Sequence, residues 1–358
     1  MTAASEDTVL VTGAFGLVGR ATVKQLVSEG RRVVATDLET PAYKKAAHKL
    51  PDGVEVRWAD LTDDGQRERL LQTVAPTAII HLVGMIAPAI YRNPALGRKL
   101  NVDLTRSLVA TAESLPHPPR FVHASSVAVF GPRNPHRYPD LADVDTPTKP
   151  NDVYGVTKLE AEQVVRASAL DWVILRLGAV VSTDLKSMLS NRDVILFESG
   201  LPTDGRVHTV DVRDVARAFA AATTADVVGD ILMIGGDETH HLRYADAGHD
   251  LIAVVGLRGA LPDGLPGKPD SEVDWFATDW MDTGPSQKAL SFQHHSWQDI
   301  LDEVGGKIGW KRHLLRPFAG VARTVLTRRS AYYGASITYA DPWAVVRSRI
   351  GDPSPGVD

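Results

Sequence analysis

The N-terminal part of the chain carries two kinds of hydrophobic pattern in succession. A short, β-branched apolar run, Thr8–Thr12, is typical of a buried strand. The apolar residues between Arg20 and Ser28 then fall at helical spacing, and Gly30 closes this predicted helix. A second apolar run, Arg31–Thr36, predicts another strand that ends at Asp37. The order is therefore strand, glycine-rich turn, helix, strand and acid.

Two later segments are also patterned. Residues 256–270 hold four glycines and three prolines, which predicts a loop without regular structure, either a lid or a plain connector. Farther on, apolar residues recur at near-helical spacing with Arg316 and Arg323 between them, so we expect an amphipathic helix. The apolar positions are Leu314, Leu315, Phe318, Val321, Ala322 and Val325.

The composition is that of a globular chain, with 358 residues of which 44% are hydrophobic and 23% charged. We expect about two domains, or one large one. The absence of cysteine excludes disulfides, a cysteine nucleophile and thiolate metal sites, and we expect no metal and no nucleic acid as partner. The N-terminus lacks a basic segment followed by an apolar one, and no apolar run is long enough to span a membrane. We therefore expect a cytoplasmic protein.

Three glycines follow the first predicted strand, and each has a physical role in binding a dinucleotide. Gly13 permits a tight turn, Gly16 lets the backbone approach a pyrophosphate, and Gly19 allows close helix–strand packing. The N-terminus of the following helix offers N–H groups to the phosphates. The Asp37 carboxylate can accept hydrogen bonds from the adenosine ribose and would repel a 2′-phosphate. The pattern predicts an NAD site rather than an NADP site.

Tyr154 and Lys158 lie four residues apart, so on a helix they occupy one face, one turn apart. Such a pair is found on many ordinary helix surfaces. In an acid–base site, the Lys158 cation would lower the pKa of Tyr154 from its usual value of about 10. An oxidised nicotinamide would add a second cation. The rest of the chain has to separate the two interpretations.

The Gly-x-x-Gly-x-x-Gly spacing resembles that of the extended short-chain dehydrogenase/reductase superfamily, and more narrowly its NAD-dependent epimerase/dehydratase branch. Further motifs match in the family's order over residues 8–235, whereas the remainder fits only loosely. These motifs are Asp60-Leu61, Ala78–Gly84, Asn93-Pro94, Asn101-Val102, Phe121–Gly131, Tyr154-x-x-x-Lys158, Leu175-Arg176 and Val210–Ala216.

The resemblance implies that Tyr154 is the catalytic acid–base and that Lys158 assists it and holds the nicotinamide ribose. It implies that Ser126 hydrogen-bonds the reacting oxygen, with Ser125 as the alternative. The role of Arg176, in substrate binding or in structure, stays open. Cofactor contacts are implied at the glycine turn, after the second, third and fourth strands, and on two helices. The residues are Gly13, Phe15, Gly16, Leu17, Gly19, Asp37, Asp60, Leu61, Leu82, Val83, Gly84, Asn101, Tyr154 and Lys158.

The fold that the resemblance implies is α/β, a Rossmann-like doubly wound parallel sheet with a smaller C-terminal substrate-binding domain. Residues 1–176 and 206–235 would form the NAD-binding domain. Residues 177–205 and 236–358 would form the substrate-binding part, which includes a basic tail at 307–349.

The residues after Ser126 reduce the number of reactions that the chain could catalyse. Relatives that eliminate water or decarboxylate have acids where this chain has Val127 and Ala128, and epimerase–reductases use a cysteine. Two reactions remain: oxidation of a secondary alcohol or reduction of the ketone, and 4-epimerisation of a nucleotide sugar. We favour the dehydrogenase because Arg206 is one place out of register with the diphosphate-binding arginine, and because the asparagine expected after Arg176 is missing. A third alternative is an NAD(H)-sensing binding protein.

The resemblance also implies a homodimer that pairs through the helix of Tyr154 and the helix before it. Ala161, Val164, Val165 and Ala169 continue the Tyr154 helix as an apolar stripe, which is either core or interface.

Charge is unevenly distributed along the chain. Residues 307–349 contain nine basic residues and the single acid Asp341, so this tail carries +8 and the rest of the chain −13. We expect the apolar stripe of the tail to pack on the substrate-binding part. The alternative is a membrane-surface helix, which would suit a lipid-like substrate.

Overall fold

The computed structural model describes residues 7–184 and 192–356. The predicted ranges that fall at 1–6, 185–191 and 357–358 lie outside the described residues. A seven-stranded parallel sheet in the order β3-β2-β1-β4-β5-β6-β9 forms the centre of the fold. Its strands are β1 (Thr8–Thr12), β2 (Arg32–Asp37), β3 (Glu55–Trp58), β4 (Ala78–His81), β5 (Arg120–Ser126), β6 (Trp172–Leu177) and β9 (Ile231–Ile234).

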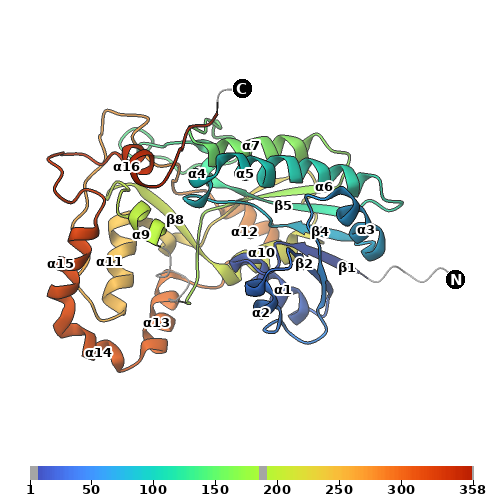
Figure 1. Ribbon diagram of the computed structural model, residues 1–358, viewed down its shortest axis with the longest axis horizontal. Coiled ribbons are helices and arrows are strands. Elements are labelled where there is room, and N and C mark those ends of the chain that lie inside the picture. Colours follow the sequence, from blue (N-terminus) through green and yellow to red (C-terminus); the bar gives the residue numbers. More distant parts are fainter. Residues whose placement is uncertain (1–6, 185–191, 357–358) are drawn as a thin grey trace.

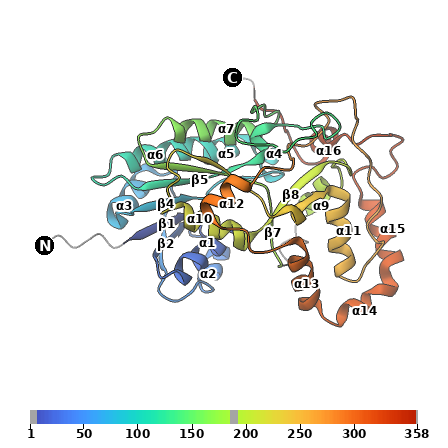
Figure 2. The same cartoon turned by 180° about the vertical axis from the view of Figure 1, so that it is seen from behind.

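Helices cover both faces of this sheet, because successive side chains of its strands point to opposite faces. Val9 and Val11 of β1 pack in one apolar cluster, whereas Leu10 packs in the other. On the first face lie α1 (Leu17–Ser28), α2 (Pro41–Ala47), α10 (Val212–Ala222) and α12 (Gly284–Leu290). On the second lie α3 (Asp64–Val74), α4 (Ala89–Arg92), α5 (Pro94–Arg98), the π-turn Lys99–Asp103, α6 (Leu104–Glu113) and α7 (Val153–Arg166) (Figures 1 and 2). The predicted doubly wound α/β fold is confirmed.

A smaller group of elements lies beyond the carboxyl edge of the sheet (Figure 2). It contains a three-stranded sheet in the order β10-β8-β7 and several helices. The strands are β7 (Ala179–Val181), β8 (Arg206–Asp211) and β10 (His241–Arg243), and the helices are α9 (Arg192–Glu198), α11 (Tyr244–Val254), α13 (Trp297–Ile308), α14 (Lys311–Leu315), the 3₁₀ turn Arg316–Phe318, α15 (Ala319–Arg329) and α16 (Pro342–Arg349).

Two expectations about this group can be compared with the structure. We assigned residues 206–235 to the NAD-binding domain, but β8 pairs with β7 and β10 in the small sheet, so that boundary is wrong for β8. Only α10 and β9, which follow β8, join the large sheet and its helices. The loop at 256–270 contains no helix or strand, as the sequence predicts.

Two apolar stripes of the sequence take different positions. On α7, Ala161 and Val165 are fully buried within this chain and belong to the core, Val164 is partly exposed, and Ala169, beyond the end of the helix, is exposed. On α14 and α15 the stripe faces outward instead: Leu314, Phe318 and Val321 are all more than half exposed. Our expectation that this second stripe packs on the substrate-binding part is wrong. None of the helices among the described residues is long and apolar enough to cross a membrane.

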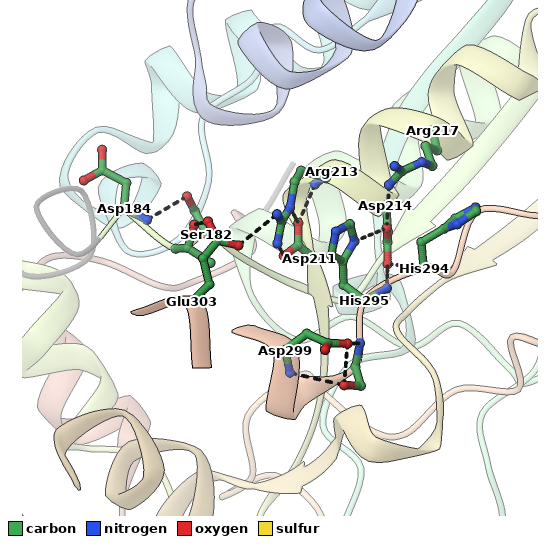
Figure 3. Close-up of polar contacts among 12 residues, drawn as sticks. Ser182, Asp184, Asp211, Arg213, Asp214, Arg217, His294, His295, Asp299 and Glu303 are labelled. Atoms are coloured by element: carbon green, nitrogen blue, oxygen red, sulfur yellow. Dashed lines mark hydrogen bonds and ion pairs between the residues drawn. The ribbon is translucent and has the colours of Figure 1, made fainter. Parts of the chain in front are cut away.

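A buried carboxylate joins the large sheet's helix α10 to the segment before α13 (Figure 3). Asp214 is fully buried and accepts hydrogen bonds from the backbone N–H groups of His294 and His295, each at 3.0 Å. Its other oxygen lies 2.7 Å from His295 Nδ1 and 3.0 Å from Arg217 Nη1. Four partners on one buried carboxylate hold the two groups of elements in a defined arrangement.

Asp211 and Arg213 form a second link in the same region (Figure 3). Asp211 caps α10 by accepting from the Arg213 N–H, and its carboxylate also pairs with the Arg213 guanidinium at 2.7 Å. The same guanidinium reaches Glu303 of α13 at 2.9 Å. The motif Val210–Ala216 thus connects α10 to α13 through Arg213, and to the segment before α13 through Asp214.

We predict that Asp214→Asn lowers the free energy of unfolding by about 2–4 kcal/mol, because the amide places N–H groups against buried donors. Urea denaturation would measure this. Asp226→Asn is the matched control, because Asp226 is exposed and makes no side-chain hydrogen bond among the described residues. Equal effects of the two substitutions would contradict the role of Asp214.

Candidate active site

The turn between β1 and α1 is shaped by close backbone contacts. Gly13 has a φ of +65°, and a Cβ added there would lie 2.9 Å from the Leu82 carbonyl carbon and from the Val83 nitrogen. A Cβ on Gly19 would lie 2.2 Å from the Gly13 oxygen. Only glycine fits these two positions, and the close approach brings the turn against the segment that follows β4.

The N-terminus of α1 directly follows this turn. Gly16 is its N-cap residue, and no side chain among the described residues caps it. The first N–H groups of the helix therefore remain available to an anion, and the helix dipole favours negative charge at this point. Leu17, the first helical residue, is partly exposed beside them.

Asp37 lies at the end of β2, beside the turn. Its carboxylate accepts a hydrogen bond from the Leu38 N–H at 2.9 Å and a longer one from the Phe15 N–H at 3.4 Å. Burial raises the pKa of Asp37, and these two backbone donors oppose the rise. The Phe15 ring is buried and packs 4.8 Å from the ring of Trp58, between centroids. The Asp37 carboxylate is thus held at the edge where a ribose would bind.

Asp60 and Leu61 follow β3, and the structure gives each a local role. The Asp60 carboxylate accepts hydrogen bonds from the Thr62 N–H and hydroxyl, at 2.9 and 2.8 Å. The Leu61 side chain is buried in the core beside Leu70 and Leu71. Any contact of this pair with an adenine would therefore come from the outer edge of the turn.

The segment after β4 is held by Asn101, which lies in the π-turn before α6. Its side-chain oxygen accepts from the Met85 N–H at 2.7 Å, and its amide donates to the Met85 carbonyl and to the Thr157 hydroxyl, both at 3.0 Å. A Cβ on Gly84 would lie 3.0 Å from the Asn101 side-chain oxygen and 3.4 Å from Lys158 Nζ. Asn101 therefore positions the Gly84 backbone against α7 and supports the site from behind.

Ser126, Tyr154 and Lys158 come together at the carboxyl edge of the sheet. Ser126 ends β5, and its hydroxyl oxygen accepts from the Ala128 N–H at 3.2 Å. The Ser126 side chain lies close enough to the Tyr154 hydroxyl to lower its pKa. Lys158 lies one turn along α7 from Tyr154, is buried, and donates to the Ala124 carbonyl at 2.9 Å. Lys158 thus faces β5, while Tyr154 is partly exposed.

The two titratable groups of this set are perturbed mainly by burial. Burial lowers the pKa of Lys158 to about 8, and the nearby Glu162 carboxylate opposes that change. Burial raises the pKa of Tyr154 to about 12, and the neighbouring Ser126 side chain opposes the rise. Desolvation of the phenol dominates the Tyr154 pKa here, since Lys158 directs its ammonium to the Ala124 carbonyl.

Glu162 extends the same face of α7 by a further turn and settles the role of Arg176. The fully buried Glu162 carboxylate accepts from Arg176 Nε at 2.9 Å and from Arg176 Nη2 at 2.7 Å. It also accepts from the Ser125 hydroxyl. Arg176 is thus a structural partner of α7, and Ser125 is committed to Glu162 while Ser126 contacts Tyr154. The repeated four-residue spacing of Tyr154, Lys158 and Glu162 was a signal in the sequence.

Asp152 is a second residue that the sequence reasoning missed. It caps α7 by accepting from the Gly155 N–H at 2.9 Å, and the Tyr91 hydroxyl donates to it as well. Burial raises the pKa of Asp152 to about 6, and these hydrogen bonds oppose the rise. An acid directly before a helix is a recognised N-cap signal, so the sequence contained the information.

An apolar cavity of about 290 Å³ lies in the smaller group of elements, between the small sheet, α9, α11 and α15. Its lining includes Leu251, Leu261, Leu326, Tyr244 and Glu198. Tyr244 and Tyr154 both pack against the apolar cluster that contains Tyr91 and Phe197, and this cluster lies between the cavity lining and the N-terminal end of α7. These residues come from distant parts of the chain, and no local pattern marks them in the sequence.

Glu198 is the acid of this cavity. Its side chain has no hydrogen-bond partner among the described residues, and burial among protein atoms raises the pKa of Glu198 to about 7. Much of the Glu198 surface is nevertheless accessible, because it faces the cavity. A ligand that fills the cavity would cover this carboxyl group.

The residues at the carboxyl edge fit a dinucleotide. The turn at Gly13 and Gly19 leaves no room for side chains, the α1 N-terminus has no side-chain cap, and Asp37 and Lys158 lie at the carboxyl edge, where the sequence predicts contacts with the two riboses. Residues 9–235 match the NAD dependent epimerase/dehydratase family.

The chain belongs to this family. NAD is accordingly its cofactor. In the described part of the chain, no group of three His, Cys, Asp or Glu side chains could hold a metal ion.

Curated relatives have different activities. A D-erythronate dehydrogenase of Cupriavidus necator is 30% identical over 184 residues, 48% of this chain and 55% of that protein. UDP-glucose 4-epimerase 4 of Oryza sativa subsp. japonica is 31% identical over 49% of each chain. Methionine adenosyltransferase 2 subunit beta of Bos taurus is 27% identical over 61% of this chain and 63% of that protein. The chain thus spans about half to two-thirds of the length of these relatives.

Solved structures agree with the fold over most of the chain. The NAD complex of Thermus thermophilus UDP-glucose 4-epimerase has a TM-score of 0.68 at 20% identity, covering 84% of this chain and 98% of that one. A short-chain dehydrogenase/reductase superfamily protein of Agrobacterium tumefaciens with bound NAD has a TM-score of 0.66 at 24% identity, covering 87% and 99%. At these identities the likeness concerns the fold.

We predict that the protein binds NAD(H) at least about tenfold more tightly than NADP(H), because Asp37 would repel a 2′-phosphate. Titration by tryptophan fluorescence is suitable, since Trp58 packs on Phe15 beside Asp37. Asp37→Asn should reduce the preference, whereas Glu39→Gln, two residues on and paired with Lys44, should keep it. Equal affinities of the unaltered protein for both cofactors would contradict the assignment.

We also predict that Tyr154→Phe lowers kcat by about 100-fold or more, the range for loss of a general acid–base, while NAD affinity stays nearly unchanged. Lys158→Ala should reduce both, because Lys158 carries two roles. Tyr333→Phe, at an exposed tyrosine, is the control. If Tyr154→Phe kept about a tenth or more of the unaltered kcat, Tyr154 would not be the acid–base.

Proposed function

We propose that this protein is an NAD-dependent dehydrogenase/reductase that interconverts a secondary alcohol and its ketone. The observation that carries the proposal is the adjacent pair of Ser126 and Tyr154, with Lys158 one turn along α7, next to the glycine turn. These groups provide a proton carrier, a cation and a donor to the reacting oxygen, which is what oxidation of an alcohol requires.

Each residue of the set has a separate role in the proposed reaction. NAD, when bound, supplies the hydride acceptor for oxidation and the hydride donor for reduction. Ser126 donates a hydrogen bond to the substrate oxygen. Tyr154 as phenolate takes the proton of the alcohol, and the Lys158 ammonium stabilises that phenolate. Since burial raises the pKa of Tyr154, this stabilisation is the main requirement on the site.

The environment of Arg206 supports an alcohol rather than a nucleotide sugar as substrate. Its guanidinium donates to the Tyr138 and Pro139 carbonyls at 2.9 and 3.2 Å, pairs with Asp279 at 3.4 Å, and lies 4.6 Å above the Trp280 ring. The side chain is thus engaged within the protein and is not available to a diphosphate. Arg176, the other arginine near the expected sugar site, is paired with Glu162.

The cavity beside Tyr244 supports an apolar substrate. Its walls are mostly aliphatic and aromatic, and burial raises the pKa of its carboxyl group, Glu198, to about 7. An apolar alcohol would be accommodated when this carboxyl group is neutral. We therefore infer a substrate whose reacting hydroxyl lies at Tyr154 and whose apolar part extends into this cavity.

A second candidate is a nucleotide-sugar 4-epimerase with tightly bound NAD. The 31% identity to UDP-glucose 4-epimerase 4 of Oryza sativa favours it, and the same Ser126, Tyr154 and Lys158 would serve. A third, an NAD(H)-sensing binding protein, is supported only by the relative described as a subunit, methionine adenosyltransferase 2 subunit beta. Incubation with UDP-glucose, followed by chromatography for UDP-galactose, separates the epimerase from the dehydrogenase, which would instead accumulate NADH from an alcohol.

The proposal predicts that a series of secondary alcohols of increasing chain length shows a rising kcat/KM with NAD, measured from NADH absorbance. Each added CH₂ that enters the cavity should raise kcat/KM roughly three- to fourfold, until the cavity is full. Absence of NADH formation across the series, together with conversion of UDP-glucose, would replace the dehydrogenase by the epimerase.

Glu198→Gln is the matched variant for this assay. Because the pKa of Glu198 is raised to about 7, the neutral form prevails below this pH and is lost as the pH rises through it. KM for the longest active alcohol should therefore increase from pH 6 to pH 8 by up to about tenfold in the unaltered protein and stay constant in Glu198→Gln. Glu29→Gln, at an exposed acid on the far end of α1, should behave like the unaltered protein.

A further inference from the structure

The helices α14 and α15 form an outer edge of the molecule. Figures 1 and 2 both show them at the end opposite the N-terminus, beyond α11 and α13. All residues from Lys311 to Phe318 are exposed. The Arg323 side chain attaches α15 to the loop at 256–270 by donating to the Gly259 and Leu261 carbonyls and pairing with Asp263 at 2.9 Å. The segment is therefore anchored from its inner side while its outer side stays uncovered.

That outer side carries a row of large apolar side chains. Trp310 is 68% exposed, Phe318 58% and Val321 64%, and Leu314 and Val325 are also exposed. They follow one another at intervals of four, four, three and four residues along α14, the 3₁₀ turn and α15. Single exposed apolar residues are normal, but a contiguous row of this kind marks an interaction surface.

Cations accompany this row. Lys311, Arg312, Arg316 and Arg328 have no ion pair within the described part of the chain, whereas the neighbouring Lys307 and Arg323 are paired with Glu303 and Asp263. From residue 307 to residue 340 the chain contains no acid. The surface therefore combines uncompensated positive charge with apolar side chains.

Three of the arginines of this region surround a hollow. Arg258, Arg312 and Arg316 line a cavity of about 540 Å³ at the junction of α11 and α14, together with Ala253, Val254 and Gly256. Guanidinium groups are weakly hydrated and bind phosphate oxygens in a bidentate manner. Three of them around one hollow suit a phosphate group.

We propose that the face formed by Trp310–Arg329 docks on an anionic phospholipid bilayer, with the apolar row in the headgroup–acyl boundary and the arginines on lipid phosphates. Cations interspersed with apolar and aromatic side chains match such a boundary, which offers both acyl chains and phosphates. The core of a protein–protein interface, by contrast, is depleted of charged residues. The acidic remainder of the chain, at −13, would be repelled by anionic lipid and so directs this face to the membrane.

Docking in this orientation has a consequence for the cavity beside Tyr244. Leu326 and Arg329 of α15 line that cavity from the inside, while Val321 and Val325 of the same helix face outward. One helix therefore separates the cavity from the proposed membrane surface. If the proposed function holds, an apolar alcohol could enter the cavity from the lipid phase past this helix. The docking itself does not depend on the proposed function.

Flotation with vesicles tests the proposal. The protein should float with phosphatidylcholine vesicles that contain about 30 mol % phosphatidylserine, and should float far less with phosphatidylcholine alone. Raising the salt from about 0.05 M to about 0.5 M should release it, because surface charges are then screened. Arg312→Glu/Arg316→Glu should lower the vesicle partition coefficient by roughly tenfold or more, since each basic residue near the surface contributes several-fold.

Two further variants distinguish the contributions. Leu314→Ser/Phe318→Ser removes apolar area without changing charge and should also lower the partition coefficient. Arg347→Glu/Arg349→Glu, at exposed arginines of α16, makes the same charge change away from the face and should leave binding nearly unchanged. Thermal unfolding and NAD titration verify that each variant is folded. Both measurements should be unaltered, because the substituted side chains are exposed and remote from the NAD site.

The outcomes that overturn the proposal are specific. Absence of flotation with anionic vesicles at low salt would end it. Equal loss in the α16 variant would show that overall charge, not this face, is responsible. If vesicles are not bound and light scattering shows a dimer that Leu314→Ser/Phe318→Ser dissociates, the face is an interface between two copies of this chain. None of these outcomes depends on the enzyme's substrate.

Discussion

The buried pair of Glu162 and Arg176 determines how the catalytic helix lies on the sheet. Arg176 of β6 and Ser125 of β5 are direct partners in the strand register, and the Glu162 carboxylate contacts both. Because the carboxylate is inside the protein, its charge must be compensated by partners in a narrow geometry. This requirement sets the rotation and height of α7, and with them the positions of Lys158 and Tyr154, one and two turns toward the N-terminus.

Burial in this arrangement shifts the pKa values of the neighbouring groups. Lys158 loses hydration and its pKa falls to about 8, while the pKa of Tyr154 rises to about 12. A protonated Lys158 is therefore the source of positive charge that the phenolate needs, and it lies one turn away instead of in contact. The site holds the required groups in place. The Tyr154 pKa would then fall in the complex with cofactor and substrate.

The same physical logic connects the two groups of elements. Asp214 and Asp211 are both fully buried. Asp214 accepts from the backbone N–H groups of His294 and His295, and Arg213, which pairs with Asp211, also reaches Glu303 of α13. Such polar contacts are directional, so they define one relative arrangement, which apolar packing alone would leave less specific. The outward face of α14 and α15 is the opposite case, because its cations lack partners and its apolar side chains lack cover within the described chain.

The sequence by itself determined the strand–turn–helix–strand unit, the choice of NAD and the i, i+4 placement of Tyr154 and Lys158. These features depend on local sterics and on the helical and strand periods, which a linear pattern records directly. Only the tertiary structure decided that Ser126 and not Ser125 meets Tyr154, that Arg176 is structural, and that β8 leaves the large sheet. It also decided that one apolar stripe lies partly in the core and the other on the surface. A periodic stripe states that a helix has an apolar face, but which surface covers that face depends on contacts between distant residues, and these exist only once the chain has folded.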